Sequence, residues 1–300
     1  MNTNVSLTLP APTAKVEAIE RSPGFWSGVI AKLMRDPVAL GACAVLFALI
    51  LIAVFAHQLV PSDPYQTSMI KRLKPIGFDG FPLGTDELGR DMLSRLMLGT
   101  RLSLFMGITP VLIAFVIGSG IGILAGYAGG LINTLIMRTI DILYAFPSVL
   151  LAIALSGALG AGIGNALLSL TIVFIPQIAR VAESVTTQVR GRDYVEAARA
   201  SGARPFTIVR VHVLGNVLGP IFVFATSLIA VSMILASGLS FLGLGVRPPE
   251  PEWGLMLNTL RTAIYTQPWV AALPGVMIFI TSISFNLLSD SLRSAMDVKS

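Results

Sequence analysis

Six apolar stretches, each long enough to cross a lipid bilayer as a helix, constrain the fold of this chain more than any other feature. They lie near residues 38–60, 103–127, 142–160, 163–181, 217–238 and 267–288. A helix needs about 20 apolar residues to cross the hydrocarbon core of a membrane. Unpaired backbone groups are costly in lipid, so such segments are expected to be helical. We predict an all-α membrane protein with about six transmembrane helices, and glycines blur the boundary between the third and the fourth.

The composition agrees with this class and excludes several others. Hydrophobic residues make up 54% of the chain, charged residues 12%, and the mean hydropathy is +0.79. The net charge of +5 is spread over the loops without a Lys/Arg run, so nucleic acid is not an expected partner. Cys43 is the only cysteine, and the two histidines are far apart, so neither a disulfide nor a metal site is expected within the chain.

Charge placement predicts the orientation of the chain. With the first span as an uncleaved anchor and six spans in all, both termini lie in the cytoplasm. Of the 21 Lys and Arg residues, 13 then lie on the cytoplasmic side and eight on the outer side, as the positive-inside rule expects. The predicted regions are a cytoplasmic tail (1–36), the first helix with an outer loop (37–100), a core transmembrane domain (101–293) and a second tail (294–300).

One polar stretch, about residues 190–216, separates two of the apolar segments and can form two short helices. Asp193 is expected to cap the first helix, with Glu196 three residues later. Gly202 stands where a helix commonly ends in a left-handed residue, and Pro205 suits the first turn of the next helix. Two interpretations remain open, namely a docking helix for a soluble protein and a simple connecting loop.

Glycines and isolated charges in the apolar segments indicate how the helices pack. Glycines recur every four residues at Gly118, Gly122, Gly126 and Gly130, a spacing that lets helices approach closely in lipid. The stripe serves either packing within one bundle or contact with a second transmembrane subunit.

Charged and aromatic residues near the ends of the apolar segments give further expectations. They are an ion pair between Arg138 and Asp141, an Arg180 side chain that reaches the headgroups, and interfacial anchors at Trp253, Tyr265 and Trp269.

The chain lacks the elements of a nucleotide hydrolase. Its five lysines follow Ala14, Ala31, Ile70, Leu73 and Val298. A Walker A motif requires a Gly-Lys pair, so this chain cannot hydrolyse ATP by the P-loop route. Neither a Gly-x-Ser-x-Gly elbow nor a His-Glu-x-x-His motif is present. We therefore predict a chain without enzymatic activity, catalytic residues or a bound cofactor.

Ordered motifs resemble a known family. The segment Glu196-Ala197-Ala198, then Gly202, then His212-Val213-Leu214-Gly215-Asn216, resembles the EAA loop of binding-protein-dependent ABC importer permeases. Further matches lie in order at Pro82–Asp91, Ser94-Arg95, Gly126-Tyr127, Phe146-Pro147, Leu239–Gly245, Pro248-Pro249, Trp253-Gly254, Pro274-Gly275 and Phe285-Asn286. The likeness covers residues 25–298 and points to the C-type permease subunit of the dipeptide/oligopeptide/nickel subfamily. Glu183 departs from the family, which often has Arg there.

This resemblance implies a type I ABC importer permease fold with a cytoplasmic coupling helix, in a bacterial inner membrane. The implied partners are a second permease, two cytoplasmic ATPases that bind ATP and Mg, and a periplasmic or lipid-anchored binding protein. The residues implied to dock on the ATPase are Asp193, Glu196, Ala197, Ala198 and Gly202. The implied cargo is di- or oligopeptides or glutathione-like peptides, with nickel chelates or opines as alternatives. A motor-independent transporter and a membrane scaffold are remoter alternatives, and no substrate-contacting residue can be named.

Overall fold

The computed structural model describes residues 25–296, in which the regular secondary structure is helical apart from two isolated β-bridges. Residues 1–24 of the predicted N-terminal tail and 297–300 of the C-terminal tail lie outside the described residues. The helices are α1 Phe25–Leu33, α2 Pro37–Leu59, η1 Met69–Lys71, α3 Met92–Ala128, α4 Gly130–Tyr144, α5 Ser148–Leu159, α6 Ile163–Arg190, α7 Asp193–Ala200, α8 Pro205–Ile208, η2 Val209–Val213, α9 Leu214–Phe241, α10 Trp253–Thr259, η3 Ala263–Tyr265 and α11 Pro268–Met296.

Within the described residues, five helices are long and apolar enough to cross a membrane. They are α2, α3, α6, α11 and the continuous helix Pro205–Phe241, which joins α8, the π-helical segment η2 and α9. A sixth span results if α4 and α5 are taken together as one broken helix. The predicted all-α membrane fold with about six spans is confirmed.

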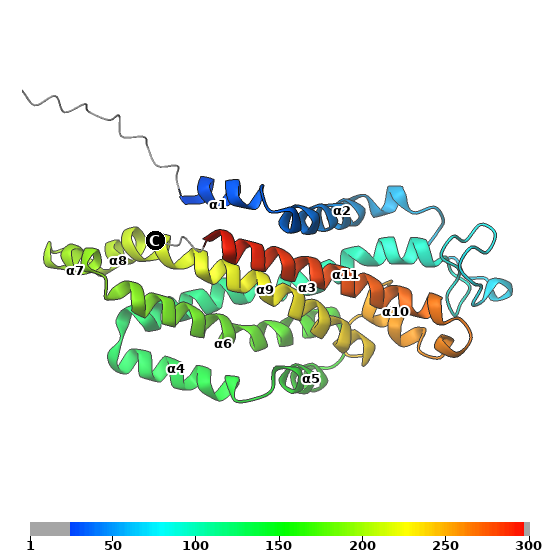
Figure 1. Ribbon diagram of the computed structural model, residues 1–300. Coiled ribbons are helices and arrows are strands. Elements are labelled where there is room, and N and C mark those ends of the chain that lie inside the picture. Colours follow the sequence, from blue (N-terminus) through cyan, green and yellow to red (C-terminus); the bar gives the residue numbers. More distant parts are fainter. Residues whose placement is uncertain (1–24, 297–300) are drawn as a thin grey trace, which may run out of the picture.

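The long helices form one elongated bundle (Figure 1). Helices α3 and α6 pack along much of their length, and α9 lies against both, with α11 on its other side. Helix α2 covers α3 and α11 on one side of this core, while α4 and α5 lie on the opposite side against α6. Helices α7 and α8 stand at one end of the bundle, and α10 stands at the other.

Small residues bring α3 and α6 together. A Cβ atom added at Gly118 would lie 2.9 Å from the Ile175 carbonyl oxygen, and one added at Gly126 would lie 2.7 Å from that of Glu183. At Gly122 the corresponding distance to the Ala179 oxygen is only 2.3 Å. Gly130 differs, because it begins α4 and an added Cβ would meet nothing within 4 Å. The close-packed stripe therefore comprises three of the four predicted glycines, and it lies within the bundle.

The third predicted span, 142–160, is not one helix. Helix α4 already covers the predicted loop at 128–141 and continues to Tyr144, after which the axis bends by 83° into α5. Pro147 precedes the first residue of α5 and cannot donate a backbone hydrogen bond, and a residue before proline disfavours helical geometry. The Phe146-Pro147 pair thus explains the break, which the glycines further along led us to expect near residue 160.

Helix α3 begins eleven residues before the predicted span at 103, because its first turn belongs to a buried charged cluster. The Asp91 carboxylate caps the helix by accepting from the Leu93 and Ser94 amides. Nearby, Asp86 pairs with Arg90 at 2.6 Å and with Arg95 at 3.2 Å, with side chains at most 6% exposed. The ion pairs fix the connection 60–91 onto the end of α3, and the predicted outer loop is correspondingly shorter.

The three expected interfacial aromatic residues differ in their surroundings. Trp253 is fully buried at the start of α10, where its indole nitrogen donates to the Leu96 carbonyl at 3.1 Å. The prediction of an interfacial anchor is therefore wrong for Trp253, whose buried indole joins α10 to α3. Tyr265 and Trp269 are exposed at the same end of the bundle, so that interpretation stays open for them.

Candidate docking surface at one end of the bundle

Helix α7 projects from the end of the bundle opposite α10, between the last turn of α6 and the short α8 (Figure 1). The N-cap position is Arg192, without a side-chain cap, and Asp193 is the first helical residue. The capping role predicted for Asp193 is therefore wrong. Asp193 and Glu196 instead occupy the first turn, where negative charges interact favourably with the helix dipole.

The end of α7 follows the predicted glycine turn. Gly202 has φ of +79°, the left-handed conformation that residues with a Cβ atom adopt at a cost. The Ala203 amide donates to the Ala198 carbonyl at 3.1 Å, and the Gly202 amide donates to that of Arg199 at 3.0 Å. These two bonds make a Schellman motif, which turns the chain sharply toward Pro205, the first residue of α8.

Buried apolar residues anchor α7 to the rest of the protein. Val195 on α7 is fully buried, and so are Ile208 and Val213 on the neighbouring segments α8 and η2. In addition, the rings of Tyr194 on α7 and His212 on η2 lie 6.3 Å apart. This packing holds α7 at a fixed place although most of its surface is in contact with solvent.

The residues predicted to dock on a partner lie on the exposed surface of this end. Asp193, Glu196, Ala197 and Gly202 are exposed, and Ala198 is half-buried. The sequence-based interpretation missed two large apolar neighbours, Phe206 at 76% and Val211 at 61% exposure. Their signal was available in the sequence, because both stand in a polar stretch outside the apolar segments. The surface formed by these seven residues is called the α7 surface below.

Two connections link the α7 surface to the transmembrane helices. After Gly202 the chain continues as one helix from Pro205 to Phe241, with the π-helical turn Val209–Val213 near its start. Before α7, the end of α6 is tied to α3 and α4. Glu183 accepts from the Asn133 amide at 2.7 Å, and Arg190 donates to the Tyr127 carbonyl at 3.3 Å. A displacement of α7 would therefore be transmitted to α6 and α9 together.

A second polar site lies further into the bundle, between α4 and α6. Arg138 and Asp141 do not pair as predicted. Asp141 instead accepts a hydrogen bond from Arg180 of α6, whose guanidinium also lies over the Tyr144 ring at 4.7 Å from its centre. The cation that pairs with Asp141 comes from the adjacent helix α6. Arg180, which was predicted to reach the lipid headgroups, instead contacts Asp141 and Tyr144 of α4. The pairing was not visible in the sequence because it depends on the register of α4 against α6.

Metal chemistry has no support in the described part of the chain. Among residues 25–296, no three His, Cys, Asp or Glu side chains are grouped so that they could hold a metal ion. The acidic residues of the α7 surface point to recognition of another protein or to helix stabilisation. The geometry therefore supports docking and transmission of movement.

Comparisons with known proteins identify the fold. The chain shares the fold of a chain in a structure described as the inward-facing MetNI methionine ABC transporter, with a TM-score of 0.56 and 22% sequence identity. The match covers 68% of this chain and 97% of the other. It thus includes nearly all of the smaller protein and leaves about a third of this chain outside.

Comparisons by sequence cover the chain more fully. It is 42% identical to the glutathione transport system permease protein GsiD of Pectobacterium atrosepticum, over 92% of this chain and 90% of that protein. It is 38% identical to the di/tripeptide transport system permease protein DppC of Pseudomonas aeruginosa, over 96% of each chain. Residues 24–75 match the N-terminal transmembrane domain of oligopeptide transport permease C.

A second family model, described as the binding-protein-dependent transport system inner membrane component, matches residues 118–299. That range includes α4–α11 and the α7 surface, together with the glycine contact between α3 and α6. The chain is a multi-pass inner membrane protein, a permease that belongs to the family of binding-protein-dependent transport system inner membrane components.

Proposed function

We propose that this chain forms half of the translocation pore of an ATP-driven importer for short peptides. A second permease subunit completes the pore, and two cytoplasmic ATPase subunits drive it. A periplasmic or lipid-anchored binding protein delivers the peptide to the α10 end of the bundle. In this arrangement both termini and the α7 surface are cytoplasmic, and the predicted regions 1–36, 37–100, 101–293 and 294–300 are retained as proposals.

The α7 surface carries the proposal. It is an exposed helix with two acidic residues and two large apolar neighbours, fixed to the bundle by buried contacts. Closure of two ATPases would move α7, and the helices α6 and α9 would follow because short connections join α7 to α6 and to the continuous helix Pro205–Phe241. Rigid-body movement of helix groups is a common way to switch a protein between two states. Asp193, Glu196, Ala197, Ala198 and Gly202 then transmit force without taking part in chemistry.

The nature of the cargo rests on the relatives. Three of them are described as permease proteins of glutathione, di/tripeptide and dipeptide transport systems. Their names favour peptides over nickel chelates or opines, the alternatives within the same complex type. The chain itself would bind no cofactor, since ATP and Mg belong to the ATPase subunits. A motor-independent transporter would not need the α7 surface, whereas a scaffold would use it as a docking site without transport.

The direct test is peptide uptake by cells in which Glu196 is replaced. Glu196→Lys reverses the charge on the exposed side of α7 and should abolish uptake of a labelled dipeptide while membrane insertion stays normal. Asp290→Lys makes the same charge change on an exposed residue of α11 and should retain most of the uptake. Normal uptake by the Glu196→Lys variant would contradict the docking role of α7.

A further inference from the structure

The ion pair between Asp141 and Arg180 is unusually accessible for charges in the transmembrane region. The two side chains are 42% and 46% exposed. Arg180 is the last residue but one of the apolar stretch 163–181, and about ten residues, or roughly 15 Å of helix, separate it from the end of α6 at Arg190. The pair thus lies within the bundle's length and on its surface.

Such a pair is expensive where it faces lipid. Charged side chains in membrane-spanning segments almost always face a bundle interior or a water-filled cavity, and they commonly mark the path of a transported solute. Helix α2 lies on the opposite side of the core from α4, and both sides expose large apolar side chains, such as Phe47 on α2 and Leu135 on α4. Because the pair is charged, we expect the part of the α4–α6 face around it to meet water or protein in the assembled transporter.

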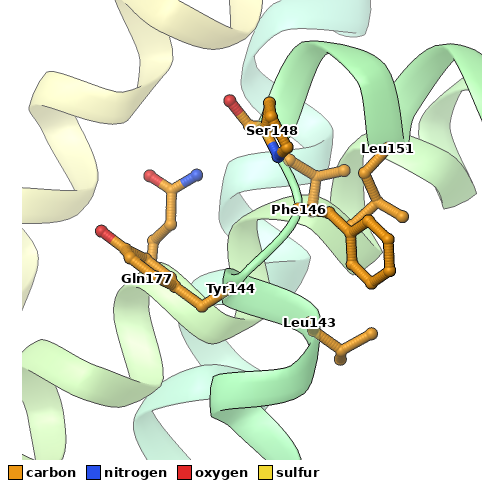
Figure 2. A pocket seen from close by; sticks show the side chains of 8 residues that line it. Leu143, Tyr144, Phe146, Ser148, Leu151 and Gln177 are labelled. Atoms are coloured by element: carbon orange, nitrogen blue, oxygen red, sulfur yellow. The ribbon is translucent and has the colours of Figure 1, made fainter.

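A pocket adjoins the ion pair at the break between α4 and α5 (Figure 2). It has a volume of about 280 Å³ and is lined by Leu143, Tyr144, Phe146, Pro147, Ser148, Leu151, Val173 and Gln177. In Figure 2 the Tyr144 ring and the Gln177 amide lie on one side of the connection, whereas the apolar Leu143 and Leu151 lie on the other. Tyr144 lines the pocket and its ring also contacts Arg180, so the ion pair lies directly beside the pocket.

The ion pair has unused hydrogen-bonding capacity. Among the bonds between described residues, only one guanidinium nitrogen of Arg180 donates, although an arginine has five N–H donors. The second carboxylate oxygen of Asp141 accepts no hydrogen bond from the described residues. The buried Asp86 differs, because both of its carboxylate oxygens accept hydrogen bonds, from the Leu88 and Arg90 amides and from the Arg90 guanidinium.

We propose that Asp141, Arg180, Tyr144 and Gln177 form a transit site for the two charged ends of a short peptide. The inference rests on the proposed peptide function. Arg180 receives the peptide carboxylate, Asp141 receives its ammonium group, and Tyr144 and Gln177 contact the amide between them. A zwitterionic peptide replaces the internal ion pair with two intermolecular ones, so charge stays paired while the peptide passes. The pair re-forms when the peptide leaves.

The test compares peptides that differ in one charged end. The complete complex, with its ATPases and binding protein, is reconstituted in liposomes and supplied with ATP. Uptake is measured for radiolabelled L-alanyl-L-alanine, for its C-terminal amide and for its N-acetyl derivative. The binding protein also discriminates among these probes, but it contributes equally for every permease variant. The informative quantity is therefore the ratio of two uptake rates, compared between variant and wild type.

We expect Arg180→Gln to lower the ratio of dipeptide to amide uptake about tenfold or more, because a charge-assisted hydrogen bond to the carboxylate is lost. Asp141→Asn should lower the ratio of dipeptide to N-acetyl peptide uptake in the same way. The matched control is Arg138→Gln on α4, since Arg138 is exposed and has no ion-pair partner among the described residues. That variant should leave both ratios at the wild-type value.

An equal loss for all three probes would contradict the transit site and would show that the pair is only a latch between α4 and α6. Unchanged ratios would contradict it as well. If Arg180→Gln does not assemble, the Asp141→Asn ratio decides the question, and failure of both variants to assemble also indicates a latch. A wild-type complex that takes up none of the probes would instead contradict the proposed peptide function itself.

Discussion

At the scale of single residues, the contact between α3 and α6 depends on the absence of a side chain at Gly122. A Cβ atom there would lie 2.6 Å from the Ala182 Cβ and 2.9 Å from the Glu183 amide nitrogen. Gly122→Ala should therefore lower the free energy of unfolding by about 1–3 kcal/mol, the usual cost of overpacking. Gly120→Ala is the control on the same helix, where an added Cβ meets nothing within 4 Å.

Unfolding of the detergent-solubilised protein by SDS measures both variants. Alanine is a better helix former than glycine by about 1 kcal/mol, so Gly120→Ala should leave stability unchanged or raise it slightly. Equal stability of the two variants would mean that α3 and α6 are further apart than the structure shows.

Gly202 determines the turn that ends α7 through its backbone conformation, whereas Gly122 acts through close packing. No atom would obstruct a Cβ there, but its φ of +79° is costly for any other residue. Gly202→Ala should destabilise the turn after α7 by about 1–2 kcal/mol. The expected result is faster amide hydrogen exchange over residues 193–203 with little change in α9. Gly215→Ala, within the helix and also without a neighbour at 4 Å, should not accelerate exchange, and equal acceleration in both variants would contradict the Schellman turn.

At the scale of elements, α10 is held at its end of the bundle by a buried carboxylate. Glu252 is 1% exposed, and its oxygens accept from the Gly254 and Leu255 amides at 2.8 and 2.9 Å. Burial raises the pKa of Glu252 above its ordinary value of 4.5, against the opposing effect of these hydrogen bonds. The folded state therefore holds a proton on Glu252 at pH values at which the unfolded chain has lost it.

This shift predicts how stability depends on pH. The stability linked to Glu252 is fully present below pH 4.5 and falls as the pH rises through the higher pKa of the folded protein, by at most about 1.4 kcal/mol per pH unit. Glu252→Gln removes this decline, because glutamine does not ionise. The measurement is the free energy of unfolding by SDS for both proteins at a series of pH values. The expectation would be contradicted if the difference between the wild type and the variant did not change with pH.

Local sequence signals predicted those elements that depend on local chemistry. The apolar stretches locate all the long helices, and Gly202 and Pro205 locate the turn after α7, because such signals act within a few residues. Trp253 was misjudged because an aromatic residue near a span end suits an interface as well as a buried contact. The Asp141–Arg180 pair escaped prediction, since it depends on the distance and register between two helices that are separate in sequence.

Breaks in the helices were predicted less well than the helices themselves. Hydropathy continues across Phe146-Pro147, so an apolar stretch gives no sign of an 83° bend, although the proline does. The start of α3 was placed too late for the opposite reason, because its first turn is polar and is stabilised by buried ion pairs. The structure shows where the α7 surface lies and that it is exposed. Docking of an ATPase on this surface stays a prediction.

At the scale of the whole molecule, the chain has two ends with different characters. At the α10 end, buried ion pairs and the buried Trp253 hold the connecting segments in place. The other end exposes α7 together with the apolar side chains of Phe206 and Val211. The continuous helix Pro205–Phe241 connects the two ends. A molecule built in this way can pass a movement at its α7 surface to the far end of the bundle.

The central claim is that this chain is a permease driven by separate ATPases that dock on α7. Its most direct test is mass spectrometry of the complex that co-purifies with the tagged chain from its native membrane in mild detergent. The account predicts a second permease and two ATPase subunits with the wild-type chain. With Glu196→Lys, it predicts the second permease without the ATPases. Recovery of the wild-type chain without any nucleotide-binding subunit, or of ATPases in equal amount with both chains, would contradict it.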